Sequence, residues 1–365
     1  MKEKFHVCVI IPELGSGGVE AVLFNYFSHM EREKYALDLV TYNVTSETRK
    51  NYFEKLGFKI IVIPTKKSGF FNSMKAMDSV LKTRKYDVIH AHLTGWNCVP
   101  MFLAWKNGIK KRISHSHIAD FSSGLSSKAM LLIQRWLIKT FANVWCACGE
   151  DAGRYLYGDV FFKKVRVLNN AIDVEKFNPD KAVREEVRKE LDISNNTFCV
   201  GHIGRFHQHK NHEFLIEVFT AVNQKCPDSC LLLVGNGDLE PMIKEKVNGL
   251  GLSEKVKFLG VREDPERIYQ AMDAFCLPSL FEGLPVVGVE AQAAKIPCVV
   301  SDRVSDKIRI TPLVTIVRLE KTADAWANIL LNQREVKTEY KFPDEYSINV
   351  MVQEWENMYF EGSHT

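Results

Sequence analysis

Four charged side chains in the second half of the chain have the types and spacing that binding a diphosphate and a sugar would require. Arg205 follows a strand-like apolar run, and Lys210 lies five residues later, directly before a helical run. Two cations there can bind an anionic group such as a phosphate. Glu282 and Glu290 lie eight residues apart, and their carboxylates can accept hydrogen bonds from the hydroxyls of a sugar and a ribose. These residues predict a site for a ligand that carries both hydroxyl groups and negative charge.

The elements that must position the two glutamates can be read in the segment 277–301, LPSLFEGLPVVGVEAQAAKIPCVVS. A buried strand over 274–277 is predicted to lead into a tight loop that carries Glu282. A short helix begins near Pro285, because proline suits the first helical position. Glu290 then lies more than one turn into this helix and faces the same crevice. The backbone N–H groups and the dipole at the start of the helix favour an anion.

Two further loops carry glycines where a predicted strand ends and a helix begins. The first holds Gly15, Gly17 and Gly18, and the second holds Gly235 and Gly237. Glycine lets the backbone approach a ligand closely, and the N–H groups that follow can bind a phosphate. The pattern G-x-G-x-x-G is incomplete in the first loop because position 20 is glutamate, so a plain tight turn is an equal alternative.

Apolar runs of strand length alternate with runs of helical period along both halves of the chain. Strands are predicted over 6–11, 37–41, 58–63, 88–91, 111–114, 144–147, 198–203, 231–234, 256–259 and 274–277, with a last strand from 298. Helices are predicted over 18–29, 71–84, 95–106, 126–141, 213–226, 239–250 and 264–272. Such alternation favours parallel, doubly wound sheets, and its restart after residue 195 indicates two Rossmann-like domains. The linker is predicted within 169–180 and a terminal helix within 346–359.

Histidines cluster at the ends of two predicted strands, where ligands of open α/β sheets bind. His90 and His92 close one strand, and His115 and His117 close the next. A single histidine at such a position is more often a satisfied core group than a functional one. We therefore interpret His90 and His92 as structural and keep the other two as candidates that face a ligand.

The composition limits the class of protein. The chain has 365 residues, of which 46% are hydrophobic, enough for two domains with cores of ordinary size. Its nine cysteines include no C-x-x-C pair and no zinc-ligand spacing, so they are predicted to be buried reduced thiols. No D-x-D metal motif follows a strand. Neither a signal segment nor an apolar run of the roughly 18 residues that span a membrane is evident, so a cytoplasmic location is expected.

Positive charge is concentrated in the first half of the chain. Residues 1–165 carry 24 Lys and Arg against 14 Asp and Glu, a balance of +10, whereas the remainder has 24 against 31, a balance of −7. This predicts an anionic partner, such as the inner face of a membrane or a lipid diphosphate, and the absence of a nucleic-acid-binding motif disfavours nucleic acid. The helix 126–141 can belong to the core or lie on lipid. We favour the core for the helix and lipid attraction for the loop charges Lys110, Lys111 and Arg112.

Three motifs together resemble the signature of the retaining glycosyltransferases of family 4. They are P-S-x-x-E-G with E-x7-E at Glu282 and Glu290, G-R-x4-K at Arg205 and Lys210, and G-G-x-E in the first loop. The resemblance covers nearly the whole chain and implies an α/β GT-B fold, with two Rossmann-like doubly wound domains facing each other across a cleft. The acceptor-binding domain would span 1–170 and the nucleotide-sugar-binding domain 171–345, and a C-terminal helix within 346–365 would return to the first domain.

The resemblance also implies a role for each matched residue. Glu290 would bind the ribose, Glu282 would bind the sugar hydroxyls, and Arg205 and Lys210 would stabilise the departing diphosphate. Further donor contacts are implied for Gly17, Gly18, Gly204, Gly235, Gly237, Val261, Arg262, Gly283, Leu284 and Pro285.

Other placements stay open under the resemblance. One histidine would lie near the donor sugar, and we favour His117 over His115. Backbone in the loop 260–262 would contact the nucleobase, while the Arg262 side chain would lie beside the base or in solvent. The chain departs from the family pattern at 302–310, where a Gly-Gly-x-x-Glu turn is missing, so the role of this segment stays open.

The implied activity is that of a hexosyltransferase with no cofactor and no metal. It would move a sugar from a nucleoside-diphosphate sugar, with uridine expected as the base and guanosine next, to a saccharide or polyprenyl-diphosphate-linked saccharide in capsule or exopolysaccharide assembly. Attack from the face that the phosphate leaves would retain the configuration, with Glu282 as a positioning group and not a covalent nucleophile. Two alternatives remain: a GT-B epimerase that splits a nucleotide sugar with water, and an inactive relative that only binds it.

Overall fold

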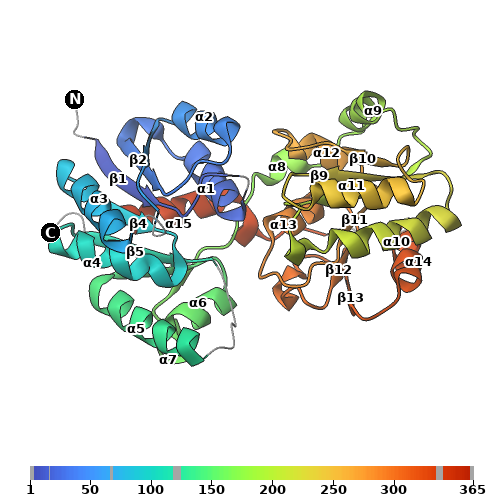
Figure 1. Ribbon diagram of the computed structural model, residues 1–365. Helices are drawn as coiled ribbons and strands as arrows, with labels where there is room; N and C mark the ends of the chain where they lie inside the picture. The colour runs from blue at the N-terminus through green and yellow to red at the C-terminus, as the bar shows by residue number, and fades with distance from the viewer. Residues whose placement is uncertain (1–3, 16, 66–68, 118–124, 334–339, 362–365) are drawn as a thin grey trace. The chain divides into compact units, whose positions relative to one another are not determined.

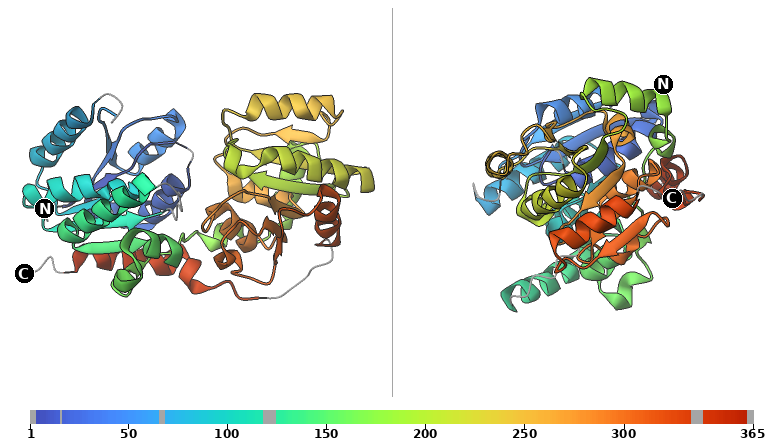
Figure 2. Two further views of the ribbon diagram at one scale, coloured as in Figure 1. Left: turned by 60° about the horizontal axis from the view of Figure 1, so that its bottom comes forward. Right: turned by 90° about the vertical axis from the view of Figure 1, so that its right-hand side faces the viewer.

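The chain folds into two compact units, each a parallel sheet flanked by helices (Figure 1). The computed structural model describes residues 4–15, 17–65, 69–117, 125–333 and 340–361. The first unit comprises residues 1–171 and 348–365, and the second comprises residues 172–347. Figure 2 shows the same elements from two further sides.

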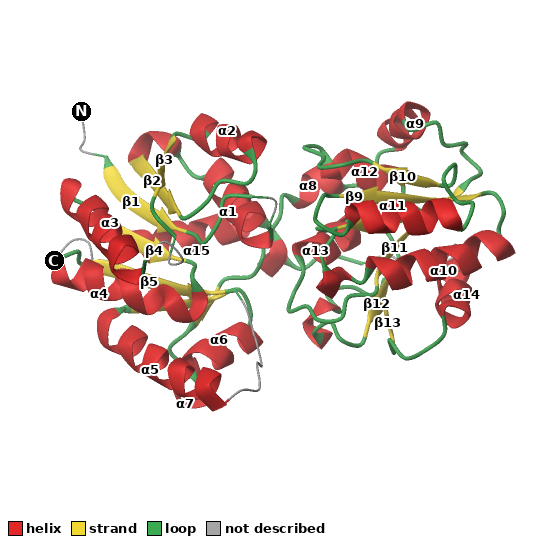
Figure 3. Ribbon diagram, in the orientation of Figure 1, coloured by secondary structure: helices red, strands yellow, loops and turns green. Residues whose placement is uncertain are grey.

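A seven-stranded sheet forms the centre of the first unit, in the order β3-β2-β1-β4-β5-β6-β7. Its pairings are parallel because helices connect successive strands, as Figure 3 shows. The strands are β1 (Phe5–Ile10), β2 (Tyr35–Thr41), β3 (Phe58–Val62), β4 (Val88–Ala91), β5 (Lys111–Ser116), β6 (Val144–Ala147) and β7 (Arg166–Val167). The helices are α1 (Gly18–His29), α2 (Glu47–Lys55), α3 (Phe70–Thr83), α4 (Cys98–Lys106), α5 (Leu125–Phe141), α6 (Glu150–Tyr157), α7 (Asp159–Phe162) and α15 (Ile348–Phe360).

The last helix of the chain, α15, belongs to the first unit. The Trp355 ring stacks on Tyr26 of α1 with centroids 4.1 Å apart, and both side chains are fully buried. Lys111 Nζ donates to the carbonyl oxygens of Met358 and Tyr359, 2.7 and 2.9 Å away. The last carbonyls of a helix have no partner within it, and its dipole favours a cation there. This aromatic pair and Lys111 are among the contacts that hold α15 in the first unit.

A six-stranded parallel sheet forms the centre of the second unit, in the order β10-β9-β8-β11-β12-β13. The strands are β8 (Phe198–Ile203), β9 (Ser229–Val234), β10 (Val256–Phe258), β11 (Ala274–Leu277), β12 (Cys298–Ser301) and β13 (Val314–Val317). The helices are α8 (Val174–Phe177), α9 (Lys181–Glu190), α10 (His212–Lys225), α11 (Glu240–Gly249), α12 (Pro265–Ala271), α13 (Val286–Ala293) and α14 (Ala323–Asn332). Buried apolar side chains of β8, β9 and β11 form a core with α10 and α14.

The predicted strands and helices correspond to observed ones whose ends differ by a few residues, and the α/β fold class is confirmed. The longer elements that the sequence did not predict are α2, α6, α9, α14 and β13. The helix α9 shows why, since much of its anchoring comes from a charged residue. Arg188 is fully buried, and its guanidinium donates to Ala271 O at 2.6 Å and to Ser194 O at 2.7 Å. Apolar periodicity does not predict such an anchor.

Candidate functional site

Lys210 and Glu282 are in direct contact in the second unit. Lys210 Nζ lies 2.5 Å from Glu282 Oε1, and the two side chains are only 12% and 15% exposed. Lys210 ends the turn that follows β8, and Glu282 lies in the loop that follows β11. Because β8 and β11 are neighbours in the parallel sheet, both loops leave the same carboxyl edge. The two residues therefore form one polar site at this edge.

Asn211 shapes the turn that carries Lys210. Its backbone is left-handed, with φ 58° and ψ 46°, and asparagine tolerates this conformation better than most residues do. Its Nδ2 donates to Pro278 O at 3.1 Å, and Leu280 N donates to His209 O at 2.7 Å. These bonds tie the loop after β8 to the loop after β11. The sequence prediction omitted Asn211, although asparagine next to a helix start is a recognised turn signal.

Hydrogen bonds fix the loop around Glu282. Ser279 Oγ donates to Glu282 Oε1 at 3.3 Å, and His209 Nε2 lies 3.9 Å from the same oxygen. The Glu282 N–H donates to Arg303 O at 3.3 Å, and its carbonyl accepts from Ser305 N at 3.0 Å. The atypical segment after β12 therefore has a structural function, since it holds the backbone of Glu282. A carboxylate with fixed neighbours is preorganised for binding.

The glycines Gly235 and Gly237 permit two loops of the second unit to touch. Their φ values are 132° and 155°, a region that other residues avoid. A Cβ atom at Gly235 would lie 2.2 Å from Gly204 O, and one at Gly237 would lie 2.5 Å from Phe206 O. Phe206 N also donates to Asn236 O at 2.9 Å. The loop after β9 therefore rests on the loop after β8, which gives these glycines a packing role in addition to the phosphate contact that the sequence suggests.

Glu290 lies within α13 and is bound to a tyrosine of α12. The helix begins at Val286, close to Pro285 as predicted, and with ψ 127° the proline itself precedes the first helical residue. Glu290 is 9% exposed, and its Oε2 accepts from Tyr269 Oη at 3.0 Å. Burial and the Glu290 charge raise the pKa of Tyr269 well above its ordinary value, so the hydroxyl stays a donor. Tyr269, which the sequence prediction missed, thus orients the carboxylate.

Arg205 and Arg262 differ in their surroundings. Arg262 Nε and Nη2 each donate to the Asp264 carboxylate at 2.8 Å, and Nη2 donates to Glu190 Oε1 at 3.0 Å. These acidic groups raise the pKa of Arg262 above its ordinary value and hold its side chain on the protein. Val261, the residue before it, is 41% exposed, and Arg205 is exposed directly after β8. Of the two predicted arginines, Arg205 is the accessible one.

Gly283 and Leu284 connect Glu282 to α13. A Cβ atom at Gly283 would meet nothing within 4 Å, so the backbone of the second unit is open at this point. Leu284 is half-buried, and the first N–H groups of α13 follow with no side-chain cap. At the neighbouring loop, Gly204 lies against Lys210, because a Cβ there would come within 3.2 Å of Lys210 Cε.

The glycine loop of the first unit is organised by Glu20. Gly17 precedes α1 and Gly18 is its first residue. Glu20 is buried, and its Oε1 accepts from Gly15 N at 3.0 Å. A Cβ atom at Gly17 would come within 2.6 Å of Glu20 Oε2, so a larger residue there would displace this carboxylate. The glutamate that breaks the G-x-G-x-x-G pattern therefore holds the loop in place.

His117 directly follows β5 in the first unit. Its Nε2 lies 2.7 Å from His92 Nδ1, and burial lowers the pKa of His117 to about 4. His115 is fully buried, and its Nδ1 lies 3.1 Å from His90 Nε2. Of the two candidates, His117 is thus the one with exposed surface.

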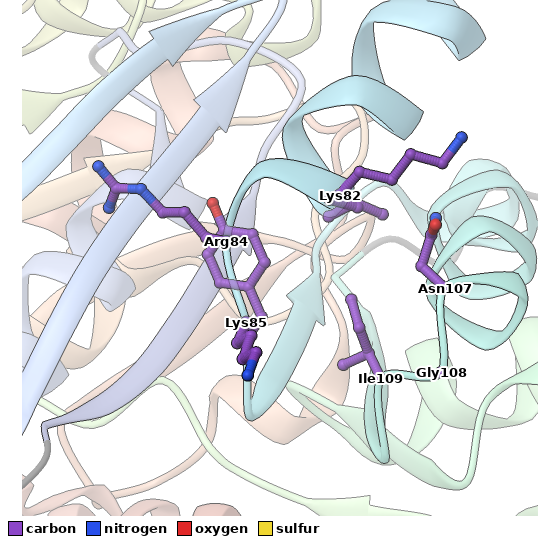
Figure 4. A pocket seen from close by; sticks show the side chains of 8 residues that line it. Lys82, Arg84, Lys85, Asn107, Gly108 and Ile109 are labelled. Atoms are coloured by element: carbon purple, nitrogen blue, oxygen red, sulfur yellow. The ribbon is translucent and has the colours of Figure 1, made fainter.

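A pocket of about 280 Å³ lies at the amino ends of the strands of the first sheet (Figure 4). Its walls include Tyr86 and Ile109, which precede β4 and β5, so it opens at the amino ends of the strands. Two of its cations are already paired, Lys82 with Asp78 at 2.5 Å and Arg84 with Asp38 at 2.6 Å. None of the sequence-predicted site residues lines this pocket.

Two family profiles match the chain. The profile described as Glycosyltransferase Family 4 matches residues 16–176, and the profile described as Glycosyl transferases group 1 matches residues 183–309. EpsF of Bacillus subtilis (strain 168), which is named as a glycosyltransferase, is 32% identical over 333 residues, covering 88% of this chain and 85% of EpsF.

Two further proteins are similar over most of the chain. The Escherichia coli UDP-Gal:alpha-D-GlcNAc-diphosphoundecaprenol alpha-1,3-galactosyltransferase is 28% identical over 300 residues, covering 78% of this chain and 76% of that enzyme. Among solved structures, HepE of Anabaena in complex with UDP-glucose matches with a TM-score of 0.75 and 19% identity, covering 97% of this chain and 95% of HepE. The latter similarity shows a shared fold.

Proposed function

The chain belongs to family 4 of the glycosyltransferases and has the GT-B fold, and from this premise we propose that it is a retaining, metal-independent transferase of polysaccharide biosynthesis. The observation that carries the proposal is the contact between Lys210 and Glu282 at one carboxyl edge of the second sheet. Arg205 lies in the same loop as Lys210. A cation pair and a carboxylate so placed can bind a diphosphate and the sugar attached to it.

Lys210 and Arg205 stabilise the leaving diphosphate. The Lys210 ammonium has three donors, so it can keep its bond to Glu282 and still donate to a phosphate oxygen. Arg205 offers a planar guanidinium that suits a phosphate. Negative charge grows on the diphosphate as the glycosidic bond lengthens, so both cations bind the transition state more tightly than the ground state and lower the barrier.

The carboxylates and the neighbouring backbone position the sugar. Glu282, with the N–H groups of Gly283 and Leu284, binds sugar hydroxyls, and Glu290 binds the ribose. The acceptor oxygen attacks from the face that the diphosphate leaves: the new C–O bond forms, the old one breaks, and the acceptor proton passes to a phosphate oxygen. This route retains the configuration and needs no covalent intermediate on the protein.

The donor and the acceptor are proposed from the relatives. The name of the E. coli relative specifies a UDP-galactose donor and a diphosphoundecaprenol-linked acceptor, and HepE was solved with UDP-glucose. A UDP-hexose donor and a polyprenyl-diphosphate-linked saccharide acceptor are therefore the first candidates for this chain, and a GDP-sugar is the next donor.

Peripheral contact with an anionic membrane is proposed for α5. The exposed apolar side chains of this helix are Met130, Leu132, Ile133 and Trp136, at 48%, 62%, 55% and 64%. An exposed apolar stripe can enter the headgroup region of a bilayer. Across the described part of the chain, no helix has the length and apolar character needed to span a membrane.

This surface bears on two parts of the sequence interpretation. The helix was expected to belong to the core, and one side of it does, since Ile138 is fully buried there, but the opposite side is exposed. The loop cations Lys111 and Arg112 were expected to attract lipid, but they serve the fold. Lys111 binds the end of α15, and Arg112 Nη1 donates to Ile109 O at 2.7 Å. Apolar side chains of α5, and not these two charges, are the membrane-facing candidates.

A product assay tests the proposed function. The full chain is incubated with a UDP-hexose, with and without a polyprenyl-diphosphate saccharide, and UDP and the product anomer are measured. We expect release of UDP that depends on the acceptor, and a product that keeps the anomeric configuration of the donor. Calorimetry should show the same UDP affinity with and without Mg²⁺. Isomerisation of the donor alone would indicate the epimerase, and binding without turnover would indicate the inactive relative; either result contradicts the proposal.

A further inference from the structure

Four histidines gather at the carboxyl ends of the neighbouring strands β4 and β5 of the first unit. Residues two apart in an extended chain point to the same face of a sheet, so His90 lies beside His92, and His115 beside His117. The ring centroids of His90 and His92 are 4.2 Å apart, and those of His92 and His115 are 5.0 Å apart. The result is a compact cluster of imidazoles.

Hydrogen bonds account for only part of the ring nitrogens in this cluster. His90 Nδ1 lies 2.9 Å from Tyr359 Oη, and His90 Nε2 lies 3.1 Å from His115 Nδ1. His92 Nδ1 lies 2.7 Å from His117 Nε2. Within the described residues, His92 Nε2 and His115 Nε2 are buried and have no hydrogen-bond partner. A buried polar atom of this kind calls for a partner that the described part of the chain does not supply.

The imidazoles of the cluster are in the form that metal ions bind. An ordinary histidine titrates near pH 6.5, so an imidazole is mostly neutral at physiological pH and keeps one nitrogen lone pair. Coordination requires such a deprotonated nitrogen.

We propose that His90, His92 and His115 form a binding site for a divalent transition-metal ion of the zinc class. Each ring offers one nitrogen, that of His90 in exchange for its hydrogen bond to His115, and the three atoms lie within 4.8 Å of one another. Imidazole nitrogens bind Zn²⁺ at about 2.0–2.1 Å, so a small convergence of the rings would place the ion between them. The second nitrogen of a metal-bound histidine is normally held by a hydrogen bond, and Tyr359 Oη and His117 Nε2 are placed to do this.

The proposed ion is structural. The cluster belongs to the first unit, whereas the residues assigned to the donor diphosphate belong to the second, so the inference does not depend on the proposed function. The Trp355 ring of α15 packs against His90 with centroids 4.9 Å apart, and Tyr359 of the same helix binds His90. An ion at the cluster would join β4 to β5 and, through Tyr359, to α15.

Cobalt binding tests the site. The full chain, without an affinity tag of histidines, is treated with a chelator and titrated with Co²⁺, whose visible absorption reports coordination by nitrogen. We expect one Co²⁺ per chain, displaced by Zn²⁺. His92→Gln and His115→Gln should each weaken binding by at least about 100-fold, and Tyr359→Phe, which removes only an outer hydrogen bond, by roughly 10- to 100-fold.

The matched control removes a different histidine pair. His207 and His209 in the second unit have Nδ1 atoms 2.7 Å apart, so the double variant His207→Gln/His209→Gln should keep one Co²⁺ per chain. Loss of binding in that variant with retention in His92→Gln would overturn the proposal, as would a folded wild type that takes up no Co²⁺ or Zn²⁺. Circular dichroism verifies folding. If the histidine variants do not fold, Tyr359→Phe provides the test, because an unchanged affinity for Co²⁺ in that folded variant overturns the proposal.

Discussion

The Lys210 ammonium group is largely withdrawn from water and compensated by Glu282. Charges that are shielded from water interact more strongly with a third charge, such as a phosphate, than exposed charges do. Sequence motifs could identify both residues, since each follows a predicted strand. They could not show that the Lys210 and Glu282 side chains touch, nor that Arg262 would be bound by Glu190, because these contacts join segments far apart in the chain.

Replacement of Lys210 tests its assigned role. We expect Lys210→Ala to lower kcat by roughly 10²- to 10³-fold, because one donor to the developing charge is lost. Steady-state release of the nucleoside diphosphate measures this. The matched control is Lys225→Ala, since Lys225 pairs with Asp324 at 2.7 Å on the surface of the same unit and should leave kcat unchanged. Turnover of Lys210→Ala close to that of the wild type would refute the role.

Two buried histidines make the stability of the second unit depend on pH. His202 of β8 and His212 of α10 have ring centroids 4.8 Å apart. Burial lowers the pKa of His212 to about 4, with Lys210 and His209 acting in the same direction, and burial lowers that of His202 well below its ordinary value. Unfolded histidine titrates near pH 6.5, so below that pH the unfolded chain binds protons that the folded chain does not. The contribution of these two histidines to the free energy of unfolding is therefore fully present above about pH 6.5 and is lost as the pH falls.

The variant His212→Gln should reduce this acid sensitivity. Each such histidine contributes up to about 1.4 kcal/mol per pH unit to the loss of unfolding free energy below pH 6.5. Urea unfolding at several pH values from about 7.5 down to 4 measures the slope. The comparison at the highest pH gives the effect of the substitution on packing alone. Equal slopes for the variant and the wild type would contradict the explanation.

At the scale of elements, the contact between the loops after β8 and β9 depends on backbone shape more than on side chains. The sequence prediction located both glycines of the β9 loop at a strand end, because glycine is a strong local signal. It could not show that their neighbours would be the Gly204 and Phe206 carbonyls, since that depends on how two strands pair. For the same reason, helices with charged anchors, such as α9 with Arg188, were missed.

A methyl group at Gly235 should disrupt this loop contact. We expect Gly235→Ala to lower the free energy of unfolding by roughly 2 kcal/mol or more, because the left-handed φ strains alanine and its Cβ meets the Gly204 carbonyl. Gly249→Ala is the control, since Gly249 ends α11 and a Cβ there meets nothing within 4 Å. Denaturant unfolding that shows equal stability for the two variants would rule out the strained contact.

At the scale of the whole chain, the first unit has both an excess of positive charge and an exposed apolar surface. The excess of cations in residues 1–165 was visible in the sequence, and so was the two-domain α/β pattern with a terminal helix. The accessible side of α5 was not visible, because an amphipathic helix looks the same in sequence whether its apolar face meets a core or solvent. Only the three-dimensional structure shows which side of α5 is buried and which is exposed.

Removal of one apolar side chain from α5 should weaken membrane binding. We expect Leu132→Ser to lower the partition coefficient onto phosphatidylglycerol vesicles by roughly 10-fold or more, because a leucine side chain gains about 1.5–3 kcal/mol on leaving water. Sedimentation with vesicles measures the bound fraction. Leu250→Ser, which changes a leucine that is 46% exposed in the second unit, should bind as the wild type does. Equal losses in both variants would count against α5 as the contact surface.

The docking of α15 onto the first unit has a consequence for biosynthesis. Trp355, Met358 and Tyr359 are almost completely buried in a unit that consists of residues 1–171 and the C-terminal segment 348–365. During translation, the early half of the polypeptide emerges from the ribosome with a gap in its interior, and that gap closes only after residue 359 has left the exit tunnel. The second unit is continuous in sequence and can fold sooner. The first unit, although its synthesis begins first, therefore completes its folding last.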